Sequence, residues 1–316
     1  MTALPILVLG RNGQLARSLA DVAAGPAGAG LALRFAGRAD VDLHDPLALS
    51  RLVGATETAI VINTAGYTAV DRAESEEAEA FALNAEAPRR IARICRSRGI
   101  GLIHISTDYV FDGNKAEPYV ETDPTAPLNV YGRSKLAGEL AVLEDMPEAL
   151  ILRTAWIFGP FGANFLKTVL RLARSGRMRI VADQIGTPTA SLHLAEAILA
   201  VCRHHASGTA PGGIYHVAGT GATNWADLAG EIVAGRITDG GPLAIVEPIA
   251  TAGYPTAARR PMNSRLSCEK LARTFAIALP DWRLGVAESL ERLRELEAGG
   301  QEIGSKEIGG QEEKSR

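Results

Sequence analysis

The chain is predicted to fold as an α/β protein, a doubly wound parallel sheet of Rossmann type with a smaller C-terminal substrate lobe. Three observations predict this class. Glycines and a helical pattern follow the first apolar run at once, similar β-branched runs recur along the chain, and helical patterns separate them. The runs lie at 5–9, 31–35, 59–63, 102–105 and 149–154. Continuous apolar runs are typical of parallel strands that helices cover on both faces.

The chain is expected to divide into three parts. Residues 1–155 are predicted to form a dinucleotide-binding domain, to which later segments return, and residues 156–296 mainly a substrate-binding lobe. Residues 297–316 are polar and low in complexity and cannot bury a core, so we expect a disordered tail there.

The composition excludes several kinds of partner. The formal net charge of −3 gives no electrostatic basis for binding nucleic acid or an anionic membrane. No apolar stretch is long enough to span a bilayer, and glycine interrupts the first apolar run too early for a signal peptide. The three cysteines show no metal-ligand spacing, so we expect free thiols in a reducing, cytoplasmic compartment.

The first predicted strand, 5–9, leads into Gly10-Arg-Asn-Gly13-Gln-Leu-Ala16 and then a helical pattern. Glycines at such a turn let backbone amides approach a pyrophosphate at the positive end of the helix. The order of strand, glycine turn and helix therefore predicts a dinucleotide site around Gly10 and Gly13, with a plain αβ turn as the alternative.

The end of the second predicted strand bears on the choice of dinucleotide. An NAD site usually carries a carboxylate there for the ribose 2′-hydroxyl. This chain has Gly37 and Arg38 instead, which favours NADP because a guanidinium suits a 2′-phosphate. A solvated Arg38 is the alternative. Asp42 and Leu43 follow and are predicted to flank the adenine ring.

Small residues follow the third predicted strand and would let a cofactor lie against the backbone, with Tyr67 and Thr68 facing the nicotinamide end. One long helix is then predicted over 72–98, from its acidic start, Ala- and Glu-rich body and basic end. Its glutamates are predicted to form a solvated face, since no histidine stands at ligand spacing. They are Glu74, Glu76, Glu77 and Glu79.

The stretch from Ser106 to Lys135 is predicted to carry the chemistry. Ser106 and Thr107 end the fourth strand, at the edge where open α/β sheets bind ligands. Tyr131 and Lys135 are four residues apart and share one face of a helix. Because a nearby ammonium lowers the pKa of a phenol, Tyr131 is predicted to exchange a proton with a substrate oxygen, which Thr107 or Ser106 would also bind. A solvated surface pair is the alternative.

The second half offers candidates for substrate binding. Trp156 follows the fifth strand and is predicted to be a substrate wall or a core residue. Further elements are predicted as helices over 164–174, 192–205 and 284–296, a strand over 213–218, and a helix with Thr223 as its N-cap. An irregular segment carries Arg259, Arg260 and Arg265, of which one could hold a substrate diphosphate. An exposed arginine loop is the alternative.

Six stretches occur in order: Gly10-x-x-Gly-Gln-Leu, Asn63-Thr-Ala-Gly-Tyr-Thr-Ala-Val-Asp-Arg-Ala-Glu-Ser, Ser106-Thr-Asp-Tyr-Val-Phe-Asp-Gly, Pro127-Leu-Asn-Val-Tyr-Gly-Arg-Ser-Lys-Leu-Ala-Gly-Glu, Arg153-Thr-Ala-Trp-Ile-Phe and Arg260-Pro-x-Asn-Ser-Arg-Leu. With them the chain resembles the extended short-chain dehydrogenases and, among these, the dTDP-4-dehydrorhamnose reductase family, over nearly its whole length except the tail. The resemblance implies reduction of the 4-keto group of dTDP-6-deoxy-L-lyxo-4-hexulose to dTDP-L-rhamnose. The reductant would be NADPH, with NADH as the alternative, and the product would be used in polysaccharide biosynthesis.

The resemblance also implies roles for individual residues. Thr107, Tyr131 and Lys135 would be the catalytic set, with Asp108 and Trp156 contacting the sugar nucleotide. The cofactor would be lined by Gly13, Gln14, Leu15, Asp42, Leu43, Gly66, Tyr67, Thr68, Tyr131 and Lys135.

Two features of the family are not expected here. Some relatives are described with magnesium bridging a dimer through glutamates, but the aligned positions are Arg17, Ser191 and Arg292. None is acidic, so neither that metal nor that dimer is expected, and the oligomeric state stays open.

Two other functions are alternatives to the reductase. One is a related nucleotide-sugar epimerase or dehydratase. The other is a non-catalytic regulatory subunit of methionine adenosyltransferase type, for which intact catalytic residues would have no purpose. The base of the sugar nucleotide also stays open.

Overall fold

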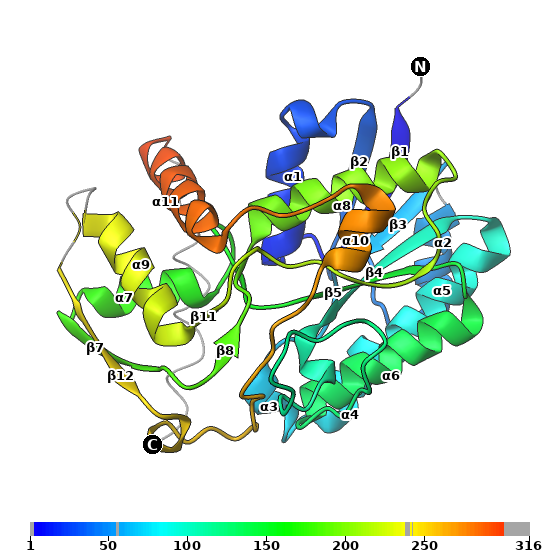
Figure 1. Ribbon diagram of the computed structural model, residues 1–316. Coiled ribbons are helices and arrows are strands. Elements are labelled where there is room, and N and C mark those ends of the chain that lie inside the picture. Colours follow the sequence, from blue (N-terminus) through cyan, green and yellow to red (C-terminus); the bar gives the residue numbers. More distant parts are fainter. Residues whose placement is uncertain (1–2, 55–56, 238–240, 242, 300–316) are drawn as a thin grey trace.

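The computed structural model describes residues 3–54, 57–237, 241 and 243–299, and its centre is a six-stranded parallel sheet (Figure 1). The strands lie in the order β10-β5-β4-β3-β1-β2. Their bounds are β1 Leu4–Leu9, β2 Leu31–Ala36, β3 Ile60–Asn63, β4 Gly101–Thr107, β5 Leu150–Thr154 and β10 Gly213–His216. The strand order reverses between β1 and β3, which is where doubly wound sheets bind ligands. The predicted fold class is confirmed.

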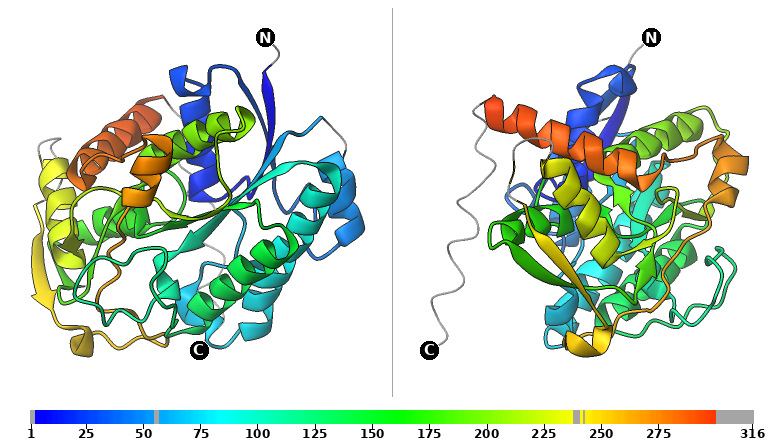
Figure 2. Two further views of the ribbon diagram at one scale, coloured as in Figure 1. Left: turned by 45° about the vertical axis from the view of Figure 1, so that its right-hand side comes forward. Right: turned by 60° about the vertical axis from the view of Figure 1, so that its left-hand side comes forward.

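Helices cover both faces of this sheet (Figures 1 and 2). On one face lie α1 (Gln14–Ala23) and α8 (Ser191–Ala206), and on the other lie α2 (Pro46–Gly54), α5 (Ala87–Arg98) and α6 (Val130–Asp145). Ile6 to Leu9 are therefore at most 2% exposed, although neighbouring side chains point to opposite faces. Burial on both faces explains why β1 shows no polar alternation.

The second half of the chain builds a lobe with its own core, at the left of Figure 1. This core includes Phe158, Leu166, Leu228 and Trp282. Its helices and parallel ribbon are α7 Phe165–Ala173, α9 Trp225–Ile237, α11 Trp282–Ala298, β7 Arg177–Val181 and β12 Ile245–Ile249. Between the lobes lie β6 Ile157–Phe158, β8 Ile185–Gly186, β9 Thr189–Ala190 and β11 Thr223–Asn224. Strand β10 and α10 (Glu269–Phe275) return to the first core.

The region predicted as one helix over 72–98 is broken, so that prediction is wrong. It forms α3 (Val70–Ala73), α4 (Glu77–Phe81), a π-helical turn (Ala82–Glu86) and α5. The cause is Asn84, whose amide exchanges hydrogen bonds with the backbone of Tyr67 at 2.8 and 3.0 Å and donates to the Ser134 hydroxyl at 2.9 Å. An inserted residue of this kind is what a π turn accommodates, often near a functional site.

The predicted solvated face of glutamates is confirmed, since Glu74, Glu77 and Glu79 are exposed and Glu76 is half-buried. Two of them also make specific bonds: Glu74 accepts from the Val130 amide at 2.8 Å, and Glu76 accepts from the Tyr67 hydroxyl at 2.5 Å. One further local prediction is corrected. Thr223 belongs to β11, and the side chain that caps α9 is Asn224, which accepts from the Asp227 amide at 2.8 Å.

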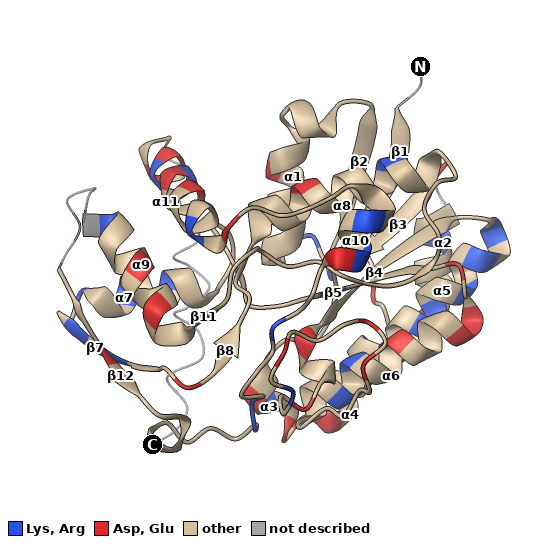
Figure 3. Cartoon of the chain, viewed as in Figure 1, with Lys and Arg blue, Asp and Glu red and all other residues tan. Residues whose placement is uncertain are grey.

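The surface carries both signs of charge, interspersed along outer helices such as α5, α6 and α11 (Figure 3). Within the described ranges, no helix has the length and apolar content needed to cross a bilayer. Helix α11 continues to Ala298, so the first two residues of the predicted tail are helical. The rest of that prediction, over 300–316, lies outside the described residues.

Candidate active site

The turn after β1 forms a cradle at the point where the strand order reverses. Gly10 has φ +104°, and a Cβ there would lie 2.7 Å from Thr64 Oγ1 at the end of β3. Gly13 precedes α1 without a side-chain cap, which leaves the first amides of that helix for a ligand. Only glycine fits this close approach, so the residues present suit a dinucleotide diphosphate.

Gln14 and Leu15 begin α1 beside this cradle. The Gln14 amide donates to the Ile157 carbonyl at 3.3 Å and so connects the turn to the second lobe. Leu15 is 6% exposed and its side chain packs in the core of the first domain. What Leu15 presents at the helix start is therefore its backbone amide.

The residues predicted near the adenosine lie after β2. Arg38 and Asp42 are exposed, and the Asp42 carboxylate accepts from the His44 amide at 2.9 Å. Leu43 is half-buried against the core. A second cation here, Arg11, was not anticipated from the sequence: it pairs with Asp40 at 3.3 Å and donates to the Phe35 carbonyl at 2.8 Å.

The loop after β3 presents backbone rather than side chains. A Cβ on Gly66 would lie 2.8 Å from Asn84 Oδ1, so the loop is pressed against the π-helical turn. The Tyr67 ring packs in a small cluster that also touches Tyr131, and its hydroxyl is bonded to Glu76. Thr68 is exposed. The backbone of Tyr67 is therefore available to contact a cofactor, whereas its hydroxyl is bonded to Glu76.

Tyr131 and Lys135 stand in the first turns of α6, where Asn129 caps the helix by accepting from the Gly132 amide at 2.8 Å. The Tyr131 hydroxyl lies close enough to the side chain of Thr107, the last residue of β4, for that hydroxyl to lower its pKa. Lys135 is 6% exposed and its Nζ donates to the Ile105 carbonyl at 2.6 Å. The structure thus brings together the three predicted catalytic residues.

The predicted direction of the Tyr131 pKa is wrong in this structure. Burial, with a smaller contribution from the charge of Asp108, raises the pKa of Tyr131 to about 12, although the nearby Thr107 hydroxyl lowers it. Burial also lowers the pKa of Lys135 to about 8, against the charge of Glu139. Removal from water disfavours both the phenolate and the ammonium, and it is the largest cause of both shifts.

Ser106 and Thr107 point to opposite faces of the sheet, and this decides which hydroxyl can bind the substrate oxygen. The Ser106 hydroxyl donates to Glu139 at 2.5 Å on the α6 side, where Glu139 and Arg153 form an ion pair at 2.6 Å with both side chains at most 2% exposed. Ser106 is thereby part of the core, and Thr107 is the hydroxyl left beside Tyr131.

Asp108 and Trp156 lie at one polar cluster beside Thr107. The Thr107 hydroxyl donates to Asp108 at 2.9 Å. Burial raises the pKa of Asp108 to about 7, against the hydrogen bonds from Ser264 and Thr107. The Trp156 indole donates to Ser264 at 3.0 Å and stacks on Trp225, with ring centroids 3.5 Å apart. Neither Ser264 nor Trp225 was singled out from the sequence, although Ser264 lies within the Arg260-Pro-x-Asn-Ser-Arg-Leu stretch.

Trp156 has a strained backbone. Its φ is +47°, in the left-handed region that a bulky residue adopts at an expense of about 1–3 kcal/mol. Such strain persists where the surroundings fix the side chain, and it clusters at functional sites. Gly186 of β8 makes room for the ring, because a Cβ there would lie 2.3 Å from the indole.

The three arginines of the irregular segment differ in their surroundings. Arg260 forms a two-pronged pair with Asp71 at 2.7 and 3.1 Å and donates to the Ala258 carbonyl at 3.1 Å, so its guanidinium is engaged with protein groups. Arg265 donates to Asn263 at 2.9 Å, whereas Arg259 is exposed. Asp71, near the start of the region predicted as a helix, is the partner that the sequence did not indicate.

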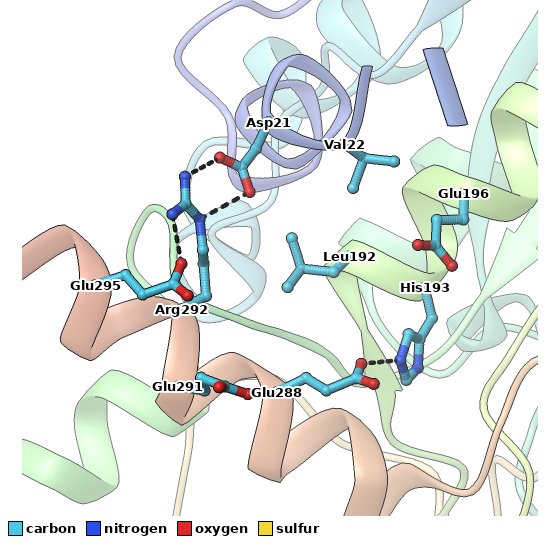
Figure 4. Close-up of a pocket in the computed structure, with 9 residues that line it drawn as sticks. All are labelled: Asp21, Val22, Leu192, His193, Glu196, Glu288, Glu291, Arg292 and Glu295. Carbon is cyan, nitrogen blue, oxygen red and sulfur yellow. Dashed lines mark hydrogen bonds and ion pairs between the residues drawn. The ribbon is translucent and has the colours of Figure 1, made fainter. Parts of the chain in front are cut away.

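A separate cavity lies between α1, α8 and α11, away from these residues (Figure 4). Arg292 pairs there with Asp21 at 2.5 Å and Glu295 at 2.7 Å, and His193 bonds Glu288. Among the described residues, no group of three histidine, cysteine or acidic side chains is arranged to hold a metal ion.

Comparison with known proteins agrees with this geometry. Residues 4–295 match the RmlD substrate binding domain family. A dTDP-4-dehydrorhamnose reductase from Burkholderia thailandensis is 46% identical over 294 residues, covering 89% of this chain and 96% of that relative. One from Sinorhizobium fredii is 41% identical over 291 residues, covering 91% and 96%.

Solved structures are similar over the same extent. A dTDP-4-dehydrorhamnose reductase from Clostridium acetobutylicum superposes with a TM-score of 0.84 at 33% identity, covering 92% of this chain and 99% of that one. Another from Bacillus anthracis, solved in complex with NADP, superposes with a TM-score of 0.83 at 32% identity, covering 92% and 100%.

The glycine cradle at the switch point, with a strand-end hydroxyl beside a helical Tyr and Lys, defines a class: the dinucleotide-dependent short-chain dehydrogenases and their relatives. Within that class the family match spans nearly the whole described chain. The chain belongs to the RmlD substrate binding domain family, whose relatives above are dTDP-4-dehydrorhamnose reductases.

Proposed function

We propose that this chain reduces the 4-keto group of dTDP-6-deoxy-L-lyxo-4-hexulose to dTDP-L-rhamnose, with NADPH as the reductant. The names of its relatives and the NADP complex of one of them support this assignment. The observation that carries it is the Tyr131 hydroxyl, which lies beside Thr107 and one helical turn from the buried ammonium of Lys135.

The residues at the carboxyl edge of the sheet suit a dinucleotide. When bound, NADPH supplies a hydride to the carbonyl carbon. Gly10, Gly13 and the first amides of α1 would hold its diphosphate, because the cradle has no room for a side chain and the helix start is uncapped. Gly66 and the backbone of Tyr67 and Thr68 would lie against its other end.

The cations near the carboxyl end of β2 favour NADPH over NADH. Arg38 is exposed, and Arg11 lies beside Gly37, where a Cβ would be 3.2 Å from the Arg11 side chain. Two guanidinium groups suit a 2′-phosphate. Asp42 and Leu43 would flank the adenine ring.

Tyr131 is the proton donor in the proposed reaction. A pKa raised to about 12 keeps its phenol protonated at neutral pH, which suits the reductive direction. Its hydroxyl gives the proton to the C4 oxygen, and the charge of Lys135 then stabilises the phenolate that remains. Thr107, whose hydroxyl donates to Asp108 in the free protein, would turn that proton to the same oxygen and stabilise the negative charge that develops there.

Asp108 and Trp156 would contact the sugar. The buried Asp108 carboxylate can accept from a sugar hydroxyl, and the Trp156 indole offers a flat apolar wall. Arg260, predicted from its charge to hold a diphosphate, is bonded to Asp71. We propose that it contributes by fastening the segment over 258–266 to α3.

A spectrophotometric assay with purified protein and the 4-keto hexulose tests this function. One NADPH oxidised for each dTDP-L-rhamnose formed, faster than with NADH, is the expected result. An epimerase or dehydratase would instead retain its cofactor and oxidise no stoichiometric NADPH, and a purely regulatory subunit would show no turnover. Either of these outcomes contradicts the proposal.

We also propose a reducing, cytoplasmic setting. The three cysteines are free thiols, and two of them, Cys95 and Cys202, are buried in the first domain. Thiols kept reduced are typical of such a compartment.

A further inference from the structure

Ser264 lies where the segment over 258–266 passes between the two lobes. Its amide donates to the Ile185 carbonyl at 2.8 Å, and the preceding Asn263 amide donates to the Gly113 carbonyl at 3.2 Å. On the other side, the Tyr119 amide donates to the Arg265 carbonyl at 2.8 Å. Backbone bonds on both sides therefore fix Ser264, which is 1% exposed.

The Ser264 hydroxyl joins two residues of the proposed substrate site. The Trp156 indole nitrogen donates to it at 3.0 Å, and Asp108 lies close enough for the Ser264 hydroxyl to lower its pKa. An indole N–H can only donate, so the Ser264 oxygen accepts from Trp156 and its own proton stays free to turn toward Asp108. The buried Oδ2 of Asp108 has no other hydrogen-bond partner among the described residues.

The same series of bonds continues to the proton donor. The Thr107 hydroxyl donates to Asp108 at 2.9 Å, which leaves its lone pairs for the Tyr131 hydroxyl and the Tyr109 amide. Asp108 is 2% exposed: its Oδ1 accepts from Thr107, and its Oδ2 has no hydrogen-bond partner in the described part of the chain and faces no competitor for the Ser264 hydroxyl. Three successive contacts, Ser264 to Asp108, Asp108 to Thr107 and Thr107 to Tyr131, therefore connect Ser264 with the proton donor.

Trp156 needs a restraint of this kind. Its backbone is in the left-handed region, and stacking on Trp225 fixes the plane of the indole without fixing its rotation within that plane. The bond from the ring nitrogen to Ser264 supplies the missing restraint.

From this geometry we infer that Ser264 is a positioning residue for the reduction: its hydroxyl holds the Trp156 wall and the Asp108 carboxylate in one fixed arrangement around the sugar. The inference rests on the proposed function. It adds a residue from the C-terminal segment, which acts through Trp156 and Asp108 and makes no contact with the reacting atoms itself.

The test compares Ser264→Ala with Ser289→Ala, a matched control. Ser289 is also fully buried, on α11, and its hydroxyl has no hydrogen-bond partner among the described residues. Kinetics with NADPH and the 4-keto hexulose should show kcat/KM for the sugar about 10- to 100-fold lower in S264A, as expected for a lost bond to a charged group. The KM for NADPH should stay within twofold, and S289A should match the wild type.

A pH profile separates positioning from a general loss of stability. Loss of the Ser264 hydroxyl removes a bond that favours ionised Asp108, so the limb of the kcat/KM profile that reports Asp108 should move to higher pH in S264A. A purely structural effect would lower the whole profile without moving it. In a Trp156→Phe background, which lacks the indole N–H, S264A should have a smaller effect than in the wild type.

The outcome that overturns the inference is an S264A variant with kinetic constants within twofold of S289A, or with an unmoved pH profile. Tryptophan emission of the free protein keeps the two proposals distinguishable. If the wild type shows no reductase activity, the proposed function fails, yet S264A should still shift the emission of Trp156 while S289A does not. Unchanged emission in S264A would count against the positioning role itself.

Discussion

Helix α6 carries two buried charged side chains one turn apart, and the fold treats them differently. The Glu139 carboxylate accepts from Ser106 at 2.5 Å and from two nitrogens of Arg153 at 2.6 to 3.1 Å. The Lys135 ammonium donates to the Ile105 carbonyl at 2.6 Å, its one hydrogen bond within the described part of the chain.

The difference separates a structural charge from a functional one. Glu139 meets its opposite charge inside the protein, and its bonds join α6 to β4 and β5. An ammonium can donate three hydrogen bonds, so Lys135 keeps capacity for a ligand. Burial lowers the pKa of Lys135 to about 8, because the ammonium has lost water and no counter-charge among the residues that the structure describes is bonded to it in return.

Breaking the structural pair should have the largest effect on stability. Glu139→Leu leaves the Arg153 guanidinium buried without its counter-charge, which should lower the free energy of unfolding by about 3–5 kcal/mol. Urea denaturation measures this, and the double variant E139L/R153M should recover most of the loss. If the single and double variants were equally unstable, the ion pair would not be the cause.

Two adjacent hydroxyls allow a sharper version of the comparison. Thr107→Ala should lower kcat about 10²- to 10³-fold, because it removes a donor to the developing oxyanion. Ser106→Ala should leave kcat within about threefold and lower the free energy of unfolding by about 1 kcal/mol, the usual contribution of one buried hydrogen bond. If Ser106→Ala lost turnover and Thr107→Ala lost only stability, then Ser106 would be the residue that binds the substrate oxygen and Thr107 the structural one.

Replacing the functional charge should stabilise the protein. In the native state the pKa of Lys135 is about 8, below its ordinary 10.5, so the buried ammonium opposes folding at pH 7. Lys135→Met should therefore raise the free energy of unfolding at pH 7 by about 2–3 kcal/mol while turnover is lost.

This advantage should shrink as pH rises from 8 to 10.5. In that window the unfolded wild type binds a proton that the native state has released, so wild-type stability rises with pH. Unfolding curves at several pH values check this. A K135M advantage that did not change with pH would mean that the methionine acts through packing alone.

The smallest effect is expected for a charge at the surface. Arg38→Ala should raise the KM for NADPH about tenfold, leave the KM for NADH within about twofold and leave stability unchanged, because an exposed guanidinium contributes little until it meets a phosphate. Equal changes with both cofactors would argue against 2′-phosphate binding.

The local sequence predicts those parts of the site that lie within one strand or one helical turn. Thr107 follows from a strand end, and Tyr131 and Lys135 follow from their spacing on α6. The direction of the Tyr131 pKa shift does not follow from the local sequence. It depends on how deeply α6 packs on the sheet, and a spacing of four residues gives no information about that depth.

Partners distant along the chain account for the other differences. Asp71 and Arg260 look like a helix acid and a phosphate ligand when each is seen in its own segment, yet they pair with one another. The Ala- and Glu-rich run over 72–98 has a continuous helical propensity, and it is broken because Asn84 bonds Tyr67 and Ser134 from two other elements. Tertiary contacts override propensity in such places.

The central claim is that the Tyr131 phenol supplies the proton, and the Tyr131→Phe variant tests it most directly. With NADPH and the 4-keto hexulose, its kcat should fall about 10²- to 10⁴-fold, while NADPH binding measured by titration stays within about threefold of the wild type. Turnover by this variant within threefold of the wild type would contradict the account, because the mechanism assigns the transferred proton to the Tyr131 phenol.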